Sequence, residues 1–274
     1  SKLPRISLTR NNFMSFKLAI SKLEVSALNH VPSIKENDDI AEIILKSMNK
    51  DSLELEDNDI VVIAQKIISK AEGCLVDLET ITPSSESIKI AEKTDKDPRL
   101  VELIIQESKE IIRIEKGVII VEHRLGHILA NAGIDQSNID HKPGKETVLL
   151  LPKNPNESAK KIKECLEIQT GKTIGVIITD SMGRPWRLGT IGHAIGASGV
   201  KTIVDLRQKG TDLFGRELQT TVIGLADQIA SSAMLVMGES NEGKPIVLVK
   251  GIDMPSDSDT VDDLIRPKEE DLFR

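Results

Sequence analysis

The chain has 274 residues, 36 of them basic and 43 acidic, and a net charge of −7. This length suits one large domain or two small ones with a sizeable core, and the acidic balance excludes the broad positive surface that nucleic-acid binding requires. Aromatic residues make up only 2% and tyrosine is absent, which argues against stacking platforms for single strands. The apolar runs are too short to span a bilayer.

The two cysteines, Cys74 and Cys165, lie far apart in the sequence. Isolated thiols are typical of a reducing cytoplasm rather than of a disulfide framework, so we expect a cytoplasmic protein. Residues 1–20 are basic and irregular, and they lack the long apolar core and the cleavage site of a signal peptide. We interpret them as an N-terminal leader or a cloning remnant, with Met14 as an alternative start.

Hydrophobic periodicity and capping residues predict the secondary structure. In chain order we expect a strand at 23–28, a helix at 38–50, a strand at 59–64, helices at 83–93 and 98–112, strands at 118–121, 128–130 and 147–151, a helix at 155–168, strands at 173–178 and 202–206, a helix at 225–237 and a strand at 245–250. Residues 252–274 read as an acidic tail, loosely packed with a short helix from 257 onward. The alternation over residues 21–251 predicts an α/β class, as one domain or two lobes.

The strand at 175–178 carries the most informative residues at its carboxyl end. Asp180 and Ser181 follow it, and then a loop broken by glycine and proline holds Arg184 and Arg187 around Trp186. Ligands of open α/β sheets bind at the carboxyl ends of strands, and guanidinium groups bind phosphate or carboxylate through paired donors. The alternative is a capped turn with surface arginines.

A second polar loop spans residues 131–138 and also follows a predicted strand. Its Asp135 and Asn138 offer oxygen donors. Together with Asp180 and Ser181 they suit Mg²⁺ or Mn²⁺, which prefer oxygen ligands. A simple Asx turn remains the alternative.

The segment 238–245 resembles a phosphate-binding Walker loop but has a proline where that motif needs Ser or Thr, and it follows a helix instead of a strand. We interpret it as an anion-binding turn or, through Glu239, as a cation ligand, with a plain helix-to-strand connection as the alternative. Lys70, after the strand at 59–64, suits phosphate unless it is merely exposed. The spacing of His123 and His127 occurs in zinc sites, but no third soft ligand is evident.

In their order along the chain, these segments resemble the coenzyme F420 γ-glutamyl ligase family. The resemblance runs from about residue 23 to 251 and weakens in the acidic tail. It is carried by residues 65–73, 96–101, 131–138, 180–187, 194–196, 215–218 and 238–245. It implies a mixed-sheet α/β fold in an intertwined homodimer. The implied activity is GTP-dependent addition of L-glutamate, and of further γ-linked glutamates, to the deazaflavin precursor F420-0 through an acyl phosphate. Two Mg²⁺ or Mn²⁺ ions and a monovalent cation are the implied cofactors.

The resemblance assigns roles to positions of this sequence. For the nucleotide it implies Val31, Pro32, Ser33, Ile34, Gln65, Lys66, Lys70, Asn138, Gly238, Glu239, Ser240, Asn241, Glu242, Gly243, Lys244 and Pro245. For the metals it implies Asp135, Asp180, Ser181 and Ser240. From the chemistry we add Arg184 and Arg187 as candidates for the precursor's phosphate or the glutamate carboxylates, beside Asp135 and Asp180 as catalytic residues.

Three departures and two alternatives accompany the resemblance, and one of the departures is that His193 lies where the family varies. His30-Val31-Pro32-Ser33 replaces the usual Gly-Leu-Pro type of turn, and Ser181 stands where threonine is common. The first alternative is a related carboxylate–amine ligase with another acceptor or nucleotide. The second is a nucleotide-binding regulatory module without catalysis, which would have no need of the Asp135, Asp180 and Ser181 set.

Overall fold

Two strands that are distant in the sequence form the centre of the main sheet. The structure is a computed structural model that describes residues 20–139, 146–253 and 255–273. β2 (Ile60–Ala64) runs parallel to β8 (Gly175–Arg184). The sheet order is β1-β12-β2-β8-β9 with all other neighbours antiparallel; the further strands are β1 (Glu24–Ala27), β9 (Arg187–Ser198) and β12 (Ile246–Lys250). The predicted α/β class is confirmed, with a mixed sheet.

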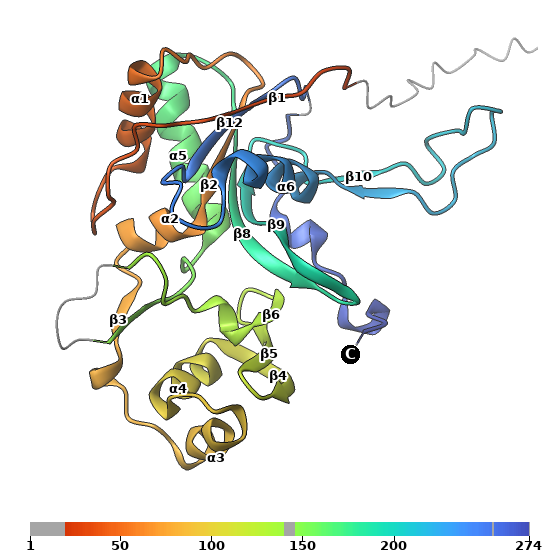
Figure 1. Cartoon of the computed structure of the whole chain (residues 1–274). Helices are drawn as coiled ribbons and strands as arrows, with labels where there is room; N and C mark the ends of the chain where they lie inside the picture. Colours follow the sequence, from red (N-terminus) through yellow and green to blue (C-terminus); the bar gives the residue numbers. More distant parts are fainter. Residues whose placement is uncertain (1–19, 140–145, 254, 274) are drawn as a thin grey trace, which may run out of the picture. The chain divides into compact units, whose positions relative to one another are not determined.

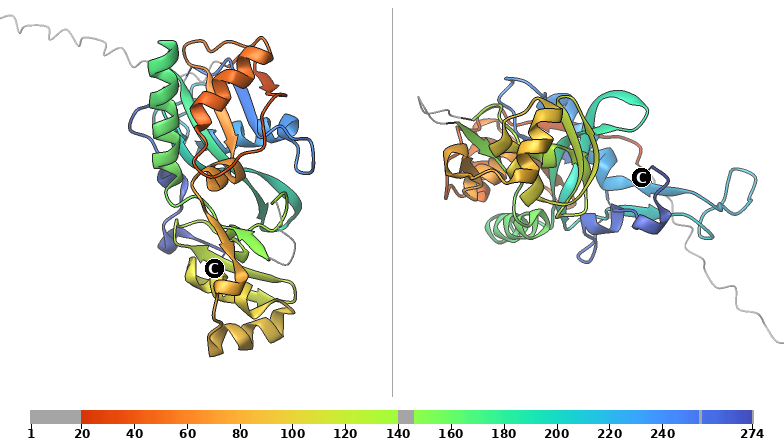
Figure 2. Two further views of the ribbon diagram at one scale, coloured as in Figure 1. Left: turned by 90° about the vertical axis from the view of Figure 1, so that its left-hand side faces the viewer. Right: turned by 90° about the horizontal axis from the view of Figure 1, so that it is seen from below.

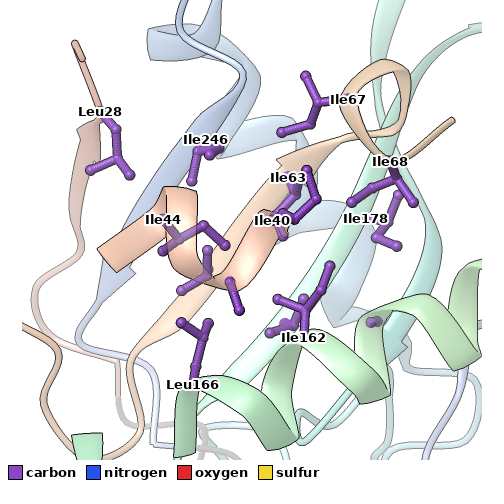
Figure 3. Packing of buried hydrophobic residues seen from close by; sticks show 14 of the residues in the cluster. Leu28, Ile40, Ile44, Ile63, Ile67, Ile68, Ile162, Leu166, Ile178 and Ile246 are labelled. Carbon is purple, nitrogen blue, oxygen red and sulfur yellow. The ribbon is translucent and has the colours of Figure 1, made fainter. Parts of the chain in front are cut away.

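Helices cover both faces of this sheet (Figure 1). α1 (Ile40–Lys50) and α5 (Pro155–Thr170) lie side by side on one face (Figure 2), and α6 (Leu225–Met237) packs on the other. A Cβ atom at Gly196 would touch Pro155 of α5, whereas one at Gly192 would touch Ala230 of α6. Figure 3 shows the core beneath α1 and α5, which includes Leu28, Ile40, Ile44, Ile63, Ile67, Ile68, Ile162, Leu166, Ile178 and Ile246.

The capping residues explain where these helices begin and end. The Asp39 side chain accepts a hydrogen bond from the Glu42 N–H at the start of α1, and Asn154 does the same for Glu157 of α5, whose first residue is Pro155. α6 ends at Gly238, which adopts a φ of 75°. These local signals lie where the sequence predicted them.

A second apolar cluster lies between residues 76 and 148. It is built mainly from α3 (Ser85–Thr94), α4 (Pro98–Gln106), β4 (Ser108–Glu115) and β5 (Val118–His123), whereas Leu129 of the neighbouring β6 (Ile128–Ala130) belongs to the first core. The last three form an antiparallel sheet. β3 (Leu75–Asp77) pairs with β7 (Thr147–Leu149) in a separate ribbon. Two cores thus exist within the α/β domain.

The predicted helix at 98–112 is wrong in its second half. α4 ends at Gln106, with Glu107 as its C-cap, and the chain continues as β4. The isoleucines at 111, 112 and 114 are β-branched and favour a strand. Pairing with β5 stabilises the strand over a helix, because Ile111 lies opposite Val121 and Ile114 lies opposite Ile119.

The predicted loop after Ile178 is also wrong. β8 continues through Asp180 and Ser181 to Arg184, and β9, which no periodicity predicted, returns alongside it. Only the two residues between the strands form the turn, and Trp186 there has a φ of 63°. Glycines at 183, 189 and 192 hid this hairpin, since glycine weakens a strand pattern while cross-strand pairing still stabilises it.

The remaining segments complete the description. Residues 204–223 form a compact unit of their own, in which the flanking strands β10 (Ile203–Asp205) and β11 (Val222–Gly224) pair. The acidic tail contains two short 3₁₀ helices, Val261–Leu264 and Lys268–Glu270, and it is anchored by the buried Val261. The predicted leader at 1–20 lies almost wholly outside the described residues. In the part of the chain that is described, no helix is long and apolar enough to cross a membrane.

Candidate functional site

Four segments that the sequence singled out meet at one edge of the main sheet. Ala64, the last residue of β2, lies opposite Thr179 of β8, so the chain that follows β2 begins next to Asp180. β12 is antiparallel to β2, and therefore the loop that precedes it enters at the same edge, where the Ala64 N–H donates to Pro245 O at 2.8 Å. β1 also ends there, since Leu28 N–H donates to Ile246 O. The parallel and antiparallel pairings of the sheet thus bring together the segments after β1 and β2, the segment before β12, and Asp180 of β8.

These four segments enclose a cavity of about 420 Å³. Its lining contains Val31, Pro32, Ser33 and Ile34 after β1, Gln65, Lys66 and Lys70 of α2 (Gln65–Ala71) after β2, Asp180 and Ser181 of β8, Asn138, and the whole loop 238–245 before β12. Of the residues expected to contact nucleotide, the structure brings every one to this cavity. Its volume lies within the usual range for small-molecule sites.

Asp180 is one of three acidic residues in the cavity lining, together with Glu239 and Glu242. Its side chain accepts a hydrogen bond from the Ser181 N–H at 2.9 Å. Burial raises the pKa of Asp180 to about 7, and the negative charges of Asp135 and Glu239 add to this rise while Lys66 opposes it. A carboxylate in this setting is stabilised by a cation.

Asp135 lies behind Lys66 rather than on the cavity wall. Lys66 Nζ contacts Asp135 Oδ2 at 2.7 Å and donates to Ser137 Oγ at 2.8 Å. Asp135 Oδ1 also accepts hydrogen bonds from the Ser137 N–H and hydroxyl, as in an Asx turn. Burial by itself would raise the pKa of Asp135, but the bonds from Lys66 and Ser137 outweigh it and hold that pKa below its usual value.

The loop 238–245 carries a third carboxylate into the same area. Both oxygens of Glu239 lie within hydrogen-bond distance of the Thr190 hydroxyl of β9, at 2.8 and 3.0 Å. Asn138 donates from its amide to Ser240 O at 3.0 Å and so ties the two loops together. The charge of Glu239 acts on Asp180, and the cavity therefore has a strongly negative corner beside Lys66 and Lys70.

The oxygen atoms that these residues offer are of the chemical type that a hard cation prefers. Asp135 and Asp180 offer carboxylate oxygens, and Ser181 and Ser240 offer hydroxyls beside them. Within residues 20–139, 146–253 and 255–273, no three His, Cys, Asp or Glu side chains form a metal-binding group on their own. This holds for His123 and His127 too, and the fully buried His123 Nε2 lies 3.4 Å from Glu107.

Besides Asp135, the two arginines are the predicted residues that the structure does not place in the lining of this cavity. Arg184 and Arg187 lie at the far end of the β8–β9 hairpin and do not belong to the described cavity lining. Arg184 donates to Leu188 O within the hairpin. Their displacement follows from the strand that replaced the predicted loop, because four further paired residues of β8, Ser181 to Arg184, follow Asp180 before the turn.

Sequence reasoning missed five residues of the cavity lining, of which Ala64 and Ile67 flank the predicted Gln65 and Lys66. Thr179 precedes Asp180, and its hydroxyl donates to the His193 carbonyl of β9. Met234 and Met237 line the cavity from the last turn of α6. The methionines are three positions apart and directly precede Gly238, so helical spacing next to a predicted binding loop is the signal that points to them.

Comparisons with known proteins identify the family of the chain. A sequence profile of the family described as F420-0:Gamma-glutamyl ligase matches residues 29–251. A relative from Methanocaldococcus jannaschii, named coenzyme F420:L-glutamate ligase, is 50% identical over 220 residues, which cover 80% of this chain and 86% of the relative. Relatives of the same name from Methanococcus maripaludis strain C7 and Methanothermobacter thermautotrophicus are 44% and 46% identical, over 92% and 89% of this chain and 98% and 96% of their own lengths. The chain therefore belongs to the F420-0:gamma-glutamyl ligase family, and it is an enzyme.

Proposed function

We propose that this enzyme forms an amide bond between L-glutamate and the carboxyl group of F420-0, the deazaflavin precursor of coenzyme F420, and that it converts GTP to GDP and phosphate as it does so. The proposal includes further γ-linked glutamates as later products. The names of the relatives support the glutamate and the F420 substrate. The resemblance in the nucleotide-contacting segments supports GTP.

One observation carries the proposal. The segments at 31–34, 65–70 and 238–245, which are far apart in the sequence, line one cavity together with Asp180 and Ser181. Lys66 and Lys70 offer positive charge for phosphate groups, and the acidic corner at Asp180 offers the site for their counter-cations. Phosphoryl transfer depends mainly on such positioning and charge neutralisation.

The proposed chemistry has two steps. An oxygen of the F420-0 carboxylate attacks the γ-phosphorus of GTP, the bond from that phosphorus to the bridging oxygen breaks, and GDP leaves. The glutamate amine, after releasing one proton to water, then attacks the acyl carbon. The C–N bond forms, the C–O bond to phosphate breaks with its electrons going to phosphate, and the nitrogen releases its remaining extra proton.

Asp135, Asp180, Ser181 and Ser240 are the residues that would hold Mg²⁺ or Mn²⁺. Their oxygen donors fit such ions, and the mutual repulsion of the carboxylates at Asp135 and Asp180 favours a bound cation. When bound, divalent ions neutralise the charge of phosphate oxygens. Lys66 orients the Asp135 carboxylate through its contact at 2.7 Å, while Lys70, which donates to Asn138 O at 2.7 Å, connects α2 to the polar loop.

We also propose a homodimer. Large apolar side chains are exposed on the single chain, with Trp186 89% and Leu188 99% exposed at the hairpin turn, and Leu235 of α6 86% exposed. Such groups mark protein contacts when they gather. A second copy that covers the hairpin turn would also bury Arg184 and Arg187. Light scattering at micromolar concentration should return about twice 30.1 kDa, and Leu188→Ser should lower that mass. A monomeric parent protein would refute the dimer.

Mass spectrometry tests the activity. The purified protein is incubated with F420-0, L-glutamate, GTP and Mn²⁺, and we expect a product heavier by one glutamate residue together with GDP. Replacing GTP by ATP tests the nucleotide, and chelator treatment tests the metal. The matched negative control is the Asp180→Asn variant. Nucleotide binding without any amide product would favour the regulatory alternative, and amide formation with another carboxylate in place of F420-0 would favour a related ligase.

A further inference from the structure

A second cavity, of about 200 Å³, lies at the free edge of β9. The turn between β5 and β6 forms one side with His127, β9 contributes His193, and α6 contributes Asp227. The acidic tail closes the cavity with Arg266 and Asp271. None of these residues lines the first cavity, and none has a role in the proposed nucleotide or metal site.

Asp227 and Arg266 form no ion pair with each other among the described residues, although the charge of His193 acts on Asp227. Among the described residues no carboxylate lies within ion-pair distance of the Arg266 guanidinium. Asp227 Oδ1 accepts a hydrogen bond from the Ala194 N–H at 2.9 Å, while its Oδ2 receives none from a described residue. Burial raises the pKa of Asp227. A bound anion would add a charge-assisted contact to the exposed Arg266, and a bound cation would stabilise the carboxylate of Asp227, which burial disfavours.

The second cavity is small and adjoins the proposed reaction site. Its volume is below the usual range for drug-sized ligands, so it suits a small molecule rather than a deazaflavin. His193 lies opposite Asp180 in the β8–β9 pairing, and residues directly opposite have Cβ atoms about 5 Å apart. α6 passes both cavities, with Asp227 in its first turn and Met234 near its end, which corresponds to about 10 Å along the helix.

We propose that this second cavity binds the amino-acid substrate, with Asp227 next to its ammonium group and Arg266 next to a carboxylate. The inference rests on the proposed function, in which an amino acid supplies the attacking amine. A zwitterionic ligand needs one negatively charged and one positively charged partner. This cavity supplies both, next to His193, which is paired with Asp180 in the β8–β9 ladder. Asp271 and the backbone around Gly183 complete the walls.

Steady-state kinetics of two variants test the assignment. Arg266→Gln removes the positive charge from an exposed side chain, and Asp227→Asn removes the negative charge but keeps an oxygen acceptor for the Ala194 N–H. We expect each change to raise the KM for glutamate about tenfold or more, since charge-assisted contacts are lost, while the KM values for GTP and F420-0 change less than about twofold. Arg113→Gln, on exposed β4 with only Glu115 as partner, is the matched control.

Equilibrium dialysis of radiolabelled glutamate, with GDP and Mn²⁺ present, separates this inference from the activity. If the parent protein forms no amide with F420-0, GTP and glutamate, the proposed function fails, and dialysis with the parent and Arg266→Gln still tests the cavity. If the parent is active and Arg266→Gln binds glutamate as tightly as Arg113→Gln does, the inference is overturned. A rise in the KM for F420-0 instead of glutamate would overturn it as well. Unchanged circular dichroism confirms that a variant is folded.

Discussion

The Lys66 ammonium contacts the Asp135 carboxylate at 2.7 Å and thereby joins α2 to the polar loop 131–138. The two residues are 69 positions apart in the sequence. Lys66 also lines the first cavity, whereas Asp135 reaches it only through this contact. The pair connects the wall that would hold phosphate to a carboxylate that would hold metal.

Lys66→Gln should therefore affect both sides of the site. Without the ammonium, the rise caused by burial is less compensated, so we expect NMR titration to show a higher pKa of Asp135 than in the parent protein. We expect the KM for GTP to rise about tenfold or more, because a charge next to phosphate is lost. Lys46→Gln, which removes only the exposed pair with Glu42, is the control. An unchanged Asp135 titration would contradict the structural relationship.

Asp180→Asn tests the centre of the site. Asparagine keeps an oxygen acceptor for the Ser181 N–H and removes a charge that burial and two neighbouring acids disfavour. We expect an unchanged or higher melting temperature, while amide formation falls by about 10²-fold or more, equivalent to about 2.7 kcal/mol of transition-state stabilisation. Asp95→Asn is the control, because Asp95 is the exposed C-cap residue of α3. A folded variant with full turnover and Mn²⁺ affinity would remove Asp180 from the reaction.

Gly192→Ala should destabilise the protein. A Cβ atom there would lie 2.6 Å from Ala230 O and from Met234 Cγ, so α6 would have to move away from β9. Overpacking of this kind costs about 1–3 kcal/mol. Gly183→Ala, in the same hairpin, meets no atom within 4 Å and should change the free energy of unfolding by less than about 0.5 kcal/mol. Urea unfolding of the two variants measures the difference, and equal stabilities would contradict the packing of α6 on β9.

His127 should make stability depend on pH. Burial lowers its pKa from 6.5 to about 4, and the charges of His123 and His193 add to this effect. Below pH 6.5 the unfolded chain therefore binds a proton that the folded chain does not bind, and the free energy of unfolding falls as the pH falls from 7 to 5. For this half-buried side chain we expect a loss of about 1 kcal/mol over that interval, after allowance for exposure to solvent.

The measurement is urea unfolding of the parent and of His127→Gln at pH 7 and pH 5. Glutamine does not titrate, so the parent should lose about 1 kcal/mol more than the variant on acidification. Other groups titrate in both proteins and cancel in the comparison. Equal losses would show that His127 is exposed to solvent in the folded protein.

Local chemistry determined much of the molecule. The helix over 225–237 and its stop at Gly238 follow from side-chain periodicity and from the conformational freedom of one glycine. Asp39 and Asn154 start their helices by bonding to N–H groups three residues away. Most residues that line the first cavity, such as those at 31–34, 65–70 and 238–245, follow a strand or precede one. Such positions are visible in a sequence because strand, turn and helix patterns change there.

Long-range pairing decided the rest. β9 and the extension of β8 to Arg184 exist because each strand supplies the other's hydrogen-bond partners, which no window of the sequence contains. That pairing moved Arg184 and Arg187 away from Asp180 and set His193 opposite it. The second cavity needs four separate segments at one sheet edge. The sequence by itself thus determined which residues have the chemistry of a ligase site, while the tertiary structure decided which of them meet, because side-chain proximity depends on strand register and helix packing between distant segments.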